Sequence, residues 1–342
     1  QVLGAASREA FGDQLPFMLK ILSAAQPLSL QTHPTRAQAE EGFAAEEAAG
    51  VPLTDPSRTF KDPWPKPEMA VAVSPFITLA GFREPDQTME LFHQLDVGTE
   101  LDQVLGPLTQ RSGSAALAEV FLDVLGMDDA RREVIDRVLA ACVPHAHENT
   151  ELGRFAQTAL MLDEFYPRDR GILAALLLNR LDLEPGQAVY LGAGNMHAHL
   201  QGTCIEVMAN SDNVLRGGLT HKHIDVDGLV KIVDFVGGPM PTVTPQTIAP
   251  GVVRYPTPAP EFALWQIGLG GREESTREPV VLPATSGARI LLVLDGHLAC
   301  SSSEGTLELV QGQAAFLSAD EVVRVQGDAE GFLVSAGVEA DH

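Results

Sequence analysis

The sequence predicts a mainly β protein made of two β units, with an α-helical segment inserted into the first. One stretch occurs twice, as Leu181–Ala193 and Leu307–Ala319, and each copy has the pattern of a strand, a Gly-containing turn and a second strand. Before the first copy, apolar residues change from short runs to a helical period, and at the first copy they return to short runs. Many short strands separated by glycine turns are typical of a sandwich or jelly roll.

The elements follow in order along the chain. From about residue 14 to residue 87, short apolar runs punctuated by prolines predict strands with short loops. In the next segment Ile135, Val138, Leu139 and Cys142 recur at helical spacing, which indicates amphipathic helices. In the last segment the dipeptide Asp295-Gly296 predicts a hairpin turn. We therefore divide the chain into the first part of β unit one (1–87), a helical insert (88–180), the second part of β unit one (181–235), a linker rich in Pro, Thr and Gly (236–260) and β unit two (261–342).

Composition limits the partners that the protein can have. The 342 residues include 46 acidic and 23 basic side chains, for a net charge of −23. Such a surface repels nucleic acid and anionic membranes, and no apolar stretch reaches the roughly eighteen residues of a membrane span. Cys142, Cys204 and Cys300 are scattered, so they predict no disulfide framework and favour the reducing cytoplasm. We expect a cytoplasmic protein and a monomer.

The two copies of the repeat differ in the residues that follow them. The first copy is followed by His197 and His199, whereas valines Val323 and Val325 stand at the matching positions after the second. The second copy shows that this strand does not need imidazole in order to fold. The first β unit is therefore predicted to carry the chemistry, and the second to be structural.

Four residues of the first unit could form a metal site. Gln31 and His33 lie two apart on a predicted strand, so they share a face, and Glu68 begins another apolar run. Together with His197 they offer nitrogen and oxygen ligands with one carboxylate, a set that zinc accepts. A lone histidine on a strand is more often a core or surface residue, but the histidine-free second copy favours the metal interpretation.

A polar segment between residues 206 and 222 allows two interpretations. In the simpler one Asp212 caps a turn and Arg216 is its ion-pair partner. In the other, Arg216, Lys222, Lys66 and Lys20 form one basic pocket on an acidic protein. Such a pocket would suit a phosphorylated substrate.

Four segments together resemble the signature sequences of a known family. They are LSLQTHP (28–34), KPEMAVAVSPF (66–76), LEPGQAVYLGAGNMHAHL (183–200) and EVMANSDNVLRGGLTHKHID (206–225). They are similar to type I mannose-6-phosphate isomerases, which are zinc enzymes of the cupin superfamily. The similarity runs in order from about Leu15 to Phe235, and more weakly through the C-terminal β unit.

This resemblance implies two cupin-type jelly rolls, a helical insert in the first, and a second without metal. It implies interconversion of mannose 6-phosphate and fructose 6-phosphate through an enediol, with one zinc ion per chain. The alternatives from the residues alone are another metal cupin, such as a dioxygenase, and a non-catalytic sugar-phosphate-binding module. The residues that the resemblance implies are the zinc ligands Gln31, His33, Glu68 and His197, the catalytic Arg216, and Lys66, Ser29, Lys20, Glu206, Asp212 and Lys222 near the substrate.

The sequence leaves several candidates for the general base. Glu206 or Asp212 is expected in that role, with Lys222 as proton partner or phosphate ligand, and His199 or a zinc-bound water is a further alternative. His199 is also a departure, because the family usually has tyrosine there, so we expect it near the substrate. The family also has an N-terminal segment that precedes the first residue of this chain, and we expect that segment to contribute strands near the site.

Overall fold

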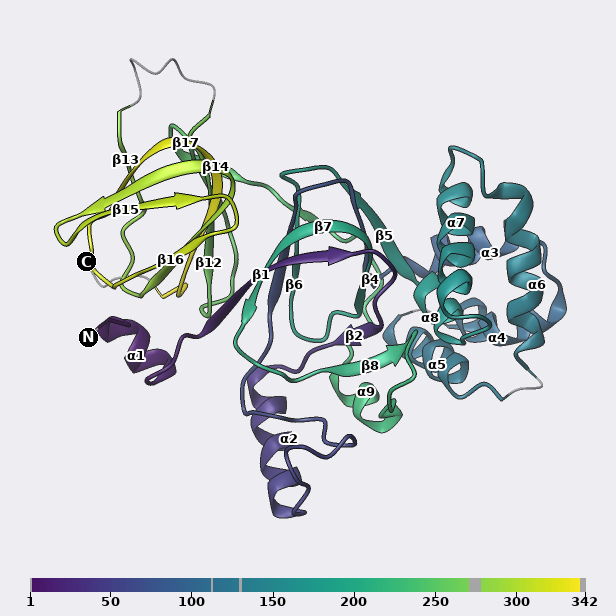
Figure 1. The fold of residues 1–342 in the computed structure, drawn as a ribbon. Helices are drawn as coiled ribbons and strands as arrows, with labels where there is room; N and C mark the ends of the chain where they lie inside the picture. Colours follow the sequence, from purple (N-terminus) through teal and green to yellow (C-terminus); the bar gives the residue numbers. More distant parts are fainter. Residues whose placement is uncertain (1, 112, 129–130, 271–277, 339–342) are drawn as a thin grey trace.

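The computed structural model describes residues 2–338 except 112, 129–130 and 271–277. Two curled antiparallel sheets lie next to each other, and a group of helices covers the far end of the first (Figure 1). The predicted fold class, mainly β with two jelly rolls and a helical insert in the first, is confirmed.

The first sheet is organised around one long strand. Among the described residues its strands follow the order β5-β4-β7-β3-β6-β9, while β1 and β2 also pair with β7, and β8 pairs with β2. All the pairings that involve β7 are antiparallel. The bounds are β1 (Phe17–Ala24), β2 (Leu30–Thr32), β3 (Glu68–Ala72), β4 (Phe76–Phe82), β5 (Leu178–Leu183), β6 (Ala188–Leu191), β7 (His197–Ala209), β8 (Leu215–Gly218) and β9 (Thr242–Val243).

A block of helices lies between β4 and β5. The residues predicted to share one face of a helix, among them Ile135 and Val138, are buried on one face of α6. Phe121 of α5 packs edge-on against Phe82 of β4 and contacts Phe235, so it joins the helices to the first β unit. The bounds are α3 (Pro85–Gln94), α4 (Thr99–Gln110), α5 (Ser114–Leu125), α6 (Glu133–Cys142), the 3-10 turn η1 (Val143–His145), α7 (Glu151–Phe165) and α8 (Gly171–Leu176).

Within the described residues, helices α1 (Ala5–Phe11), α2 (Arg36–Ala48) and α9 (Val226–Ile232) lie outside this block. The expectation of strands and short loops across residues 14–87 is wrong over α2. Thr35 accepts a hydrogen bond from the backbone of Gln38, and the Gln38 side chain accepts one from the backbone of Thr35. This capping box starts the helix, and its Thr-x-x-Gln pattern is the signal by which the sequence could have revealed α2.

The second sheet has the order β10-β11-β12-β17-β14-β15 among the described residues, with β13 beside β17 and β16 beside β14. Val323 and Val325, the counterparts of His197 and His199, are buried in its apolar core. The bounds are β10 (Gln246–Ala249), β11 (Val252–Tyr255), β12 (Ala263–Gly268), β13 (Val280–Val281), β14 (Arg289–Ser302), β15 (Gly305–Val310), β16 (Ala314–Leu317) and β17 (Arg324–Ser335).

Two local expectations differ from the structure. Residues 236–260, expected to be a linker, form β9 of the first sheet and β10 and β11 of the second, because buried residues such as Val252 and Tyr255 anchor them. Asp295-Gly296 is no hairpin turn, since β14 runs through it with a register shift against β17. Gly296 has φ +76, which produces a bulge that bends one long strand.

The two β units share one apolar cluster. Phe17, Met69 and Ile205 of the first unit pack in this cluster with Phe262 and Phe332 of the second. The chain start is tied to the second unit as well, since the backbone N–H of Ala319 donates to the carbonyl of Val2 at 3.0 Å. The site-bearing sheet therefore has the helices on one side and a packed β unit on the other (Figure 1).

Candidate active site

Strand β7 and its neighbours bring the predicted metal ligands together. His197 begins β7 and lies directly opposite Gln31 of β2 in the register, and His33 follows β2 by one residue. Glu68 begins β3, which pairs with the other half of β7. Residues opposite each other in an antiparallel pair project to the same face. The sheet thus brings together predicted ligands from three separate segments, at residues 31–33, 68 and 197.

The geometry around Glu68 fits a bound cation. Its Oε1 lies 3.3 Å from Nε2 of His33, and its Oε2 lies 3.3 Å from Nε2 of His197. In both imidazoles Nδ1 is hydrogen-bonded to a backbone carbonyl. The partner of His33 is the carbonyl of Asn213 at 2.7 Å, and the partner of His197 is the carbonyl of Asn195 at 3.1 Å. A carbonyl only accepts, so each Nδ1 carries a hydrogen and each ring turns its Nε2 towards Glu68.

In the neutral tautomer each Nε2 lone pair would face a carboxylate oxygen, an arrangement that repels unless a cation lies between them. Nε2 of His33, Nε2 of His197 and Oε2 of Glu68 are buried and have no hydrogen-bond partner. Two imidazole nitrogens and a carboxylate, with Gln31 opposite His197 in the strand register, are a donor set that suits zinc. The residues present therefore fit the metal that the resemblance implies.

The protonation states also suit a metal. Burial would raise the pKa of Glu68, but His33, His197 and Lys66 outweigh burial and hold that pKa well below its usual range. Burial lowers the pKa of His197, and Glu68 offsets only part of that effect. An ionised carboxylate and a neutral imidazole are the forms in which these groups bind metal.

A second group of polar residues adjoins the first. Nε2 of His199 lies 3.3 Å from Oε1 of Glu206, and Glu68, His199 and Glu206 together are close enough to hold an ion. Two ammonium groups already lie on this side, with Lys66 Nζ 3.0 Å from Glu68 Oε1 and Lys20 Nζ 3.9 Å from Glu206 Oε2. Lys20 pairs with Glu206, a member of the second group alone, so we expect the metal at the His33–Glu68–His197 group.

His199 and Glu206 meet only because β7 is irregular. The two residues are seven apart, so a regular strand would place them on opposite faces. Gly202 lies between them with φ +106, and β7 passes there from pairing with β4 to pairing with β1 and β3. A Cβ at Gly202 would come within 2.3 Å of the carbonyl of Pro75. The bend at this glycine brings both side chains to the same site.

The remaining predicted residues lie at different distances from the cluster. Arg216 of β8 is half-buried, lies opposite Gln31 in the register, and has its pKa lowered by burial. Ser29 is half-buried just before β2. Asp212 and Lys222 are exposed in the segments on either side of β8. The expected basic pocket therefore has Lys20 and Lys66 at the carboxylates, whereas Lys222 lies on an outer loop.

Two residues that contact the site escaped the sequence reasoning. Oγ1 of Thr78 in β4 lies 2.9 Å from Nδ1 of His199 and donates to the carbonyl of Ala198 at 3.1 Å. It therefore accepts from Nδ1 and leaves Nε2 of His199 facing Glu206. Asn213 acts through its backbone carbonyl on His33. Thr78 reads as an ordinary strand residue, but the Ser-Asp-Asn turn could have drawn attention to Asn213.

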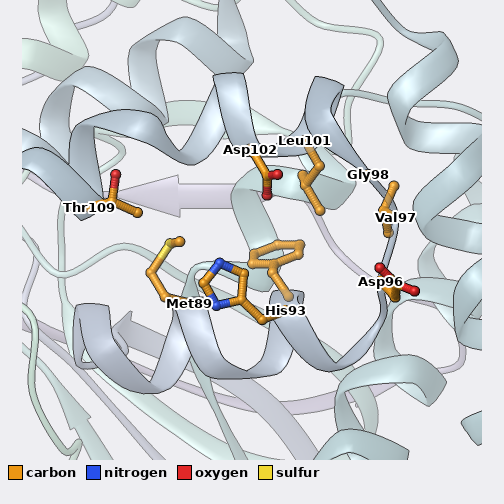
Figure 2. Close-up of a pocket in the computed structure, with 9 residues that line it drawn as sticks. Met89, His93, Asp96, Val97, Gly98, Leu101, Asp102 and Thr109 are labelled. Carbon is orange, nitrogen blue, oxygen red and sulfur yellow. The ribbon is translucent and has the colours of Figure 1, made fainter.

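A cavity elsewhere in the molecule is separate from this site. It has a volume of about 270 Å³ and lies between α3 and α4 in the helical insert (Figure 2). Its lining, which includes Met89, His93, Asp96, Asp102 and Thr109, comes entirely from residues 89–109.

Among the described residues, no helix is both long and apolar enough to cross a membrane.

Known proteins are similar in sequence to most of this chain. The family model described as "Phosphomannose isomerase type I, catalytic domain" matches residues 2–85. Mannose-6-phosphate isomerase of Escherichia coli (strain K12) is 36% identical over 321 residues, which cover 94% of this chain and 78% of that protein. Mannose-6-phosphate isomerase of Macaca fascicularis is 31% identical, covering 95% of this chain and 77% of that protein.

Solved structures agree with the sequence comparison. A mutant of phosphomannose isomerase from Salmonella typhimurium is 33% identical, with a TM-score of 0.84, covering 98% of this chain and 82% of that chain. A mannose 6-phosphate isomerase structure described as the zinc-bound holo form is 33% identical, with a TM-score of 0.83 and the same coverage. With this fold, this cluster and these relatives, the chain belongs to the type I mannose-6-phosphate isomerase family.

Proposed function

We propose that this protein is a zinc-dependent aldose–ketose isomerase that interconverts mannose 6-phosphate and fructose 6-phosphate. The observation that carries the proposal is the buried Glu68 carboxylate, whose two oxygens face two unpartnered imidazole nitrogens beside a second carboxylate and two lysines. Membership of the family supplies the substrate, which the relatives' names state. Gln31, His33, Glu68 and His197 would hold the zinc, which supplies Lewis-acid polarisation of the substrate oxygens when bound.

The reaction moves one proton between neighbouring carbons. A base removes the C2 proton of the open-chain aldose while O1 gains a proton, which gives the enediol. A proton is then delivered to C1 while the O2 hydrogen leaves and C2 becomes the carbonyl. The C–H bond is weakly acidic, so negative charge that develops on oxygen must be stabilised. Arg216, half-buried and opposite Gln31, would supply fixed positive charge at that edge of the substrate.

Glu206 is the base that the geometry favours. Its side chain is 5% exposed, its Oε1 faces His199, and its Oε2 lies near Lys20. Asp212, the other carboxylate considered, is exposed and outside the cluster. Thr78 would orient the His199 ring, whose Nε2 faces Glu206, while Lys20 lies beside the other oxygen of this carboxylate.

The substrate phosphate needs positive charge that the cluster does not use. Lys222 is exposed on the loop after β8, six residues beyond Arg216, and is our candidate phosphate ligand. Ser29, half-buried just before β2, would contribute a hydroxyl at the substrate. Lys20 and Lys66 would contact sugar oxygens while neutralising Glu206 and Glu68.

We further infer a monomer in the cytoplasm, supported by the acidic composition and the three unpaired, buried cysteines.

A coupled assay tests the reaction and the metal together. Fructose 6-phosphate formed from mannose 6-phosphate is measured on chelator-treated protein, with and without added zinc. Turnover that returns with zinc is the expected result. A folded, zinc-loaded protein without turnover would overturn the enzymatic proposal and leave a sugar-phosphate-binding module.

The variant Arg216→Ala tests the stabilisation of charge. We expect kcat to fall by about 100-fold or more while zinc content stays at the wild-type level, because removing one donor to a developing oxyanion has an effect of that order. Arg137→Ala is the control, since Arg137 pairs with Glu100 in the helical insert. Undiminished turnover by metal-loaded Arg216→Ala would show that this role is wrong.

A further inference from the structure

The Asn213 side chain is buried and joins two distant segments of the chain. Its Oδ1 accepts from the backbone N–H of Lys61 at 2.7 Å and of Asp62 at 3.3 Å. Its Nδ2 donates to the carbonyl of Asp62 at 2.7 Å and of Trp64 at 2.8 Å. Every part of the amide is therefore bonded to residues 61–64, about 150 positions earlier in the chain.

The same residue holds a metal ligand through its main chain. The Asn213 carbonyl accepts from Nδ1 of His33 at 2.7 Å, which fixes the tautomer that points the Nε2 lone pair towards Glu68. A carbonyl partner of this kind orients a ligating imidazole and raises its basicity. The position of this carbonyl depends on where the Asn213 side chain is anchored.

The anchored loop leads directly to the site. Two residues after Trp64 comes Lys66, and then Glu68, whose oxygens face both imidazoles. Arg216 follows Asn213 by three residues. Asn213 thus contacts both the His33 ring and the loop that leads to Glu68, and it precedes Arg216 by three residues.

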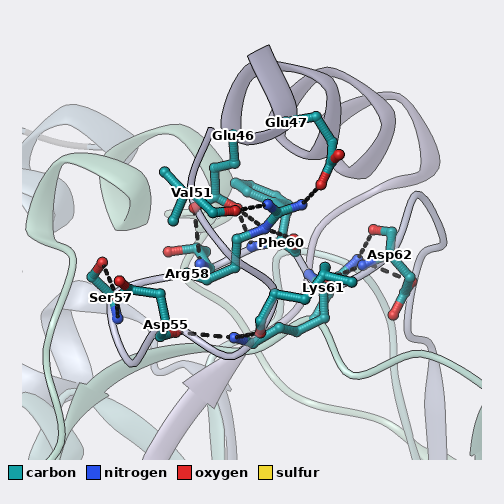
Figure 3. Close-up of polar contacts among 12 residues, drawn as sticks. Glu46, Glu47, Val51, Asp55, Ser57, Arg58, Phe60, Lys61 and Asp62 are labelled. Carbon is teal, nitrogen blue, oxygen red and sulfur yellow. Dashed lines mark hydrogen bonds and ion pairs between the residues drawn. The ribbon is translucent and has the colours of Figure 1, made fainter. Parts of the chain in front are cut away.

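The other end of this loop is held separately (Figure 3). The buried Arg58 guanidinium donates to the carbonyls of Phe60 and Val51, and pairs with Glu47 at 2.7 Å and with Glu46 at 3.1 Å. These contacts tie the beginning of the loop to α2. Asn213 and Ser211, whose hydroxyl donates to Asp62 at 2.8 Å, hold the end of the loop that enters β3, where Glu68 is paired with β7.

We propose that Asn213 is a positioning residue for the metal centre, because its amide fixes residues 61–64 and its carbonyl fixes the His33 ring. The inference rests on the proposed zinc site, since it concerns how that site is held. Loss of the amide would leave the ligand types intact while their relative positions loosen. Zinc affinity would then fall although each ligand remains present.

Zinc affinity, measured by competition with a chromophoric chelator, tests this inference. We expect Asn213→Ala to bind zinc about 10- to 100-fold more weakly than the wild type, the range found when outer partners of metal ligands are removed. Cobalt(II) loaded in place of zinc should show an altered visible absorption spectrum. Asn213→Asp, equal in size but with oxygen in place of the donating NH₂, should show the same direction of change without leaving a cavity.

Two controls separate positioning from general loss of stability. Asn210→Ala removes an amide in the same segment that donates to the carbonyl of Leu15, away from residues 61–64. Thr150→Ala removes the cap of α7, which destabilises the helical insert without touching the site. Both should keep wild-type zinc affinity and the wild-type cobalt spectrum.

The outcomes distinguish the two levels of the argument. If the wild type itself binds no zinc, the proposed function fails and the positioning role fails with it. If the wild type binds zinc and both Asn213 variants keep its affinity and spectrum, only the positioning role is overturned. If Asn213→Ala does not fold, the comparison of Asn213→Asp with the wild type decides.

Discussion

Glu68 is the residue on which the candidate site depends most. Each of its oxygens faces a histidine nitrogen at 3.3 Å, and Lys66 supplies the nearest positive charge at 3.0 Å. The ligand types could be predicted, because the histidine-free second copy of the repeat singles out His197. The hydrogen bonds that select the His33 tautomer could not, because they run through the carbonyl of Asn213, 180 residues away.

Glu68→Gln should separate metal binding from folding. An amide NH₂ can donate to an imidazole lone pair, so the metal-free variant should be about as stable as the metal-free wild type. Without the carboxylate charge, zinc affinity should fall by more than about 100-fold, beyond the effect of losing an outer partner. Isothermal titration with zinc and urea unfolding would measure the two quantities.

Glu304→Gln, at an exposed position of the second β unit, is the control for Glu68→Gln and should change neither quantity. Unchanged zinc affinity in Glu68→Gln would place the metal away from Glu68.

Among the elements, β7 shows what periodicity can and cannot predict. Its apolar and histidine pattern predicts a strand, and the strand is present. A strict two-residue alternation cannot predict that His199 and Glu206 share a face, because the bend at Gly202 depends on the strands that pack beside it. The same limit applies to Gly296, where a turn-forming dipeptide lies inside the continuous strand β14.

Gly202→Ala should therefore lower both stability and turnover. The residue has φ +106, and a Cβ there would meet the Pro75 carbonyl at 2.3 Å, so the bend must shift. Such a strained position costs about 1–3 kcal/mol of the free energy of unfolding. Urea unfolding and the isomerase assay, run on the same preparation, would check both effects.

Gly268→Ala provides the comparison for Gly202→Ala, because a Cβ at Gly268 of β12 meets nothing within 4 Å. It should have wild-type turnover and little change in stability. Equal behaviour of the two variants would contradict the part assigned to the bend.

At the scale of the whole molecule, the metal cluster joins separate stretches of the chain. His33, Glu68 and His197 come from three segments, and the helical insert separates the second from the third. The two-unit architecture could be predicted from the repeat, but the shared cluster that includes Met69 and Phe262 could not, since no local pattern shows which apolar faces meet. Long-range packing therefore brings together the cluster residues that the separate short motifs contain.

Zinc should stabilise the folded protein in a concentration-dependent way. The unfolded chain does not bring the three ligands together, so zinc binds the folded state and adds about 2.7 kcal/mol at a free concentration 100 times Kd. Differential scanning calorimetry of chelator-treated protein should show a melting temperature that rises with added zinc. Glu68→Gln should show no such rise, and an equal rise in that variant would mean that zinc acts elsewhere.

The pairing of β7 on both sides has a consequence for local opening. From Cys204 to Met208 this strand lies between β1 and β3, so its amide hydrogens are released only when a large part of the sheet opens. The loop with Lys222 is exposed and can open alone. Deuterium labelling should therefore reach the candidate phosphate ligand quickly, while the strand that carries Glu206 stays protected until the first β unit unfolds as a whole.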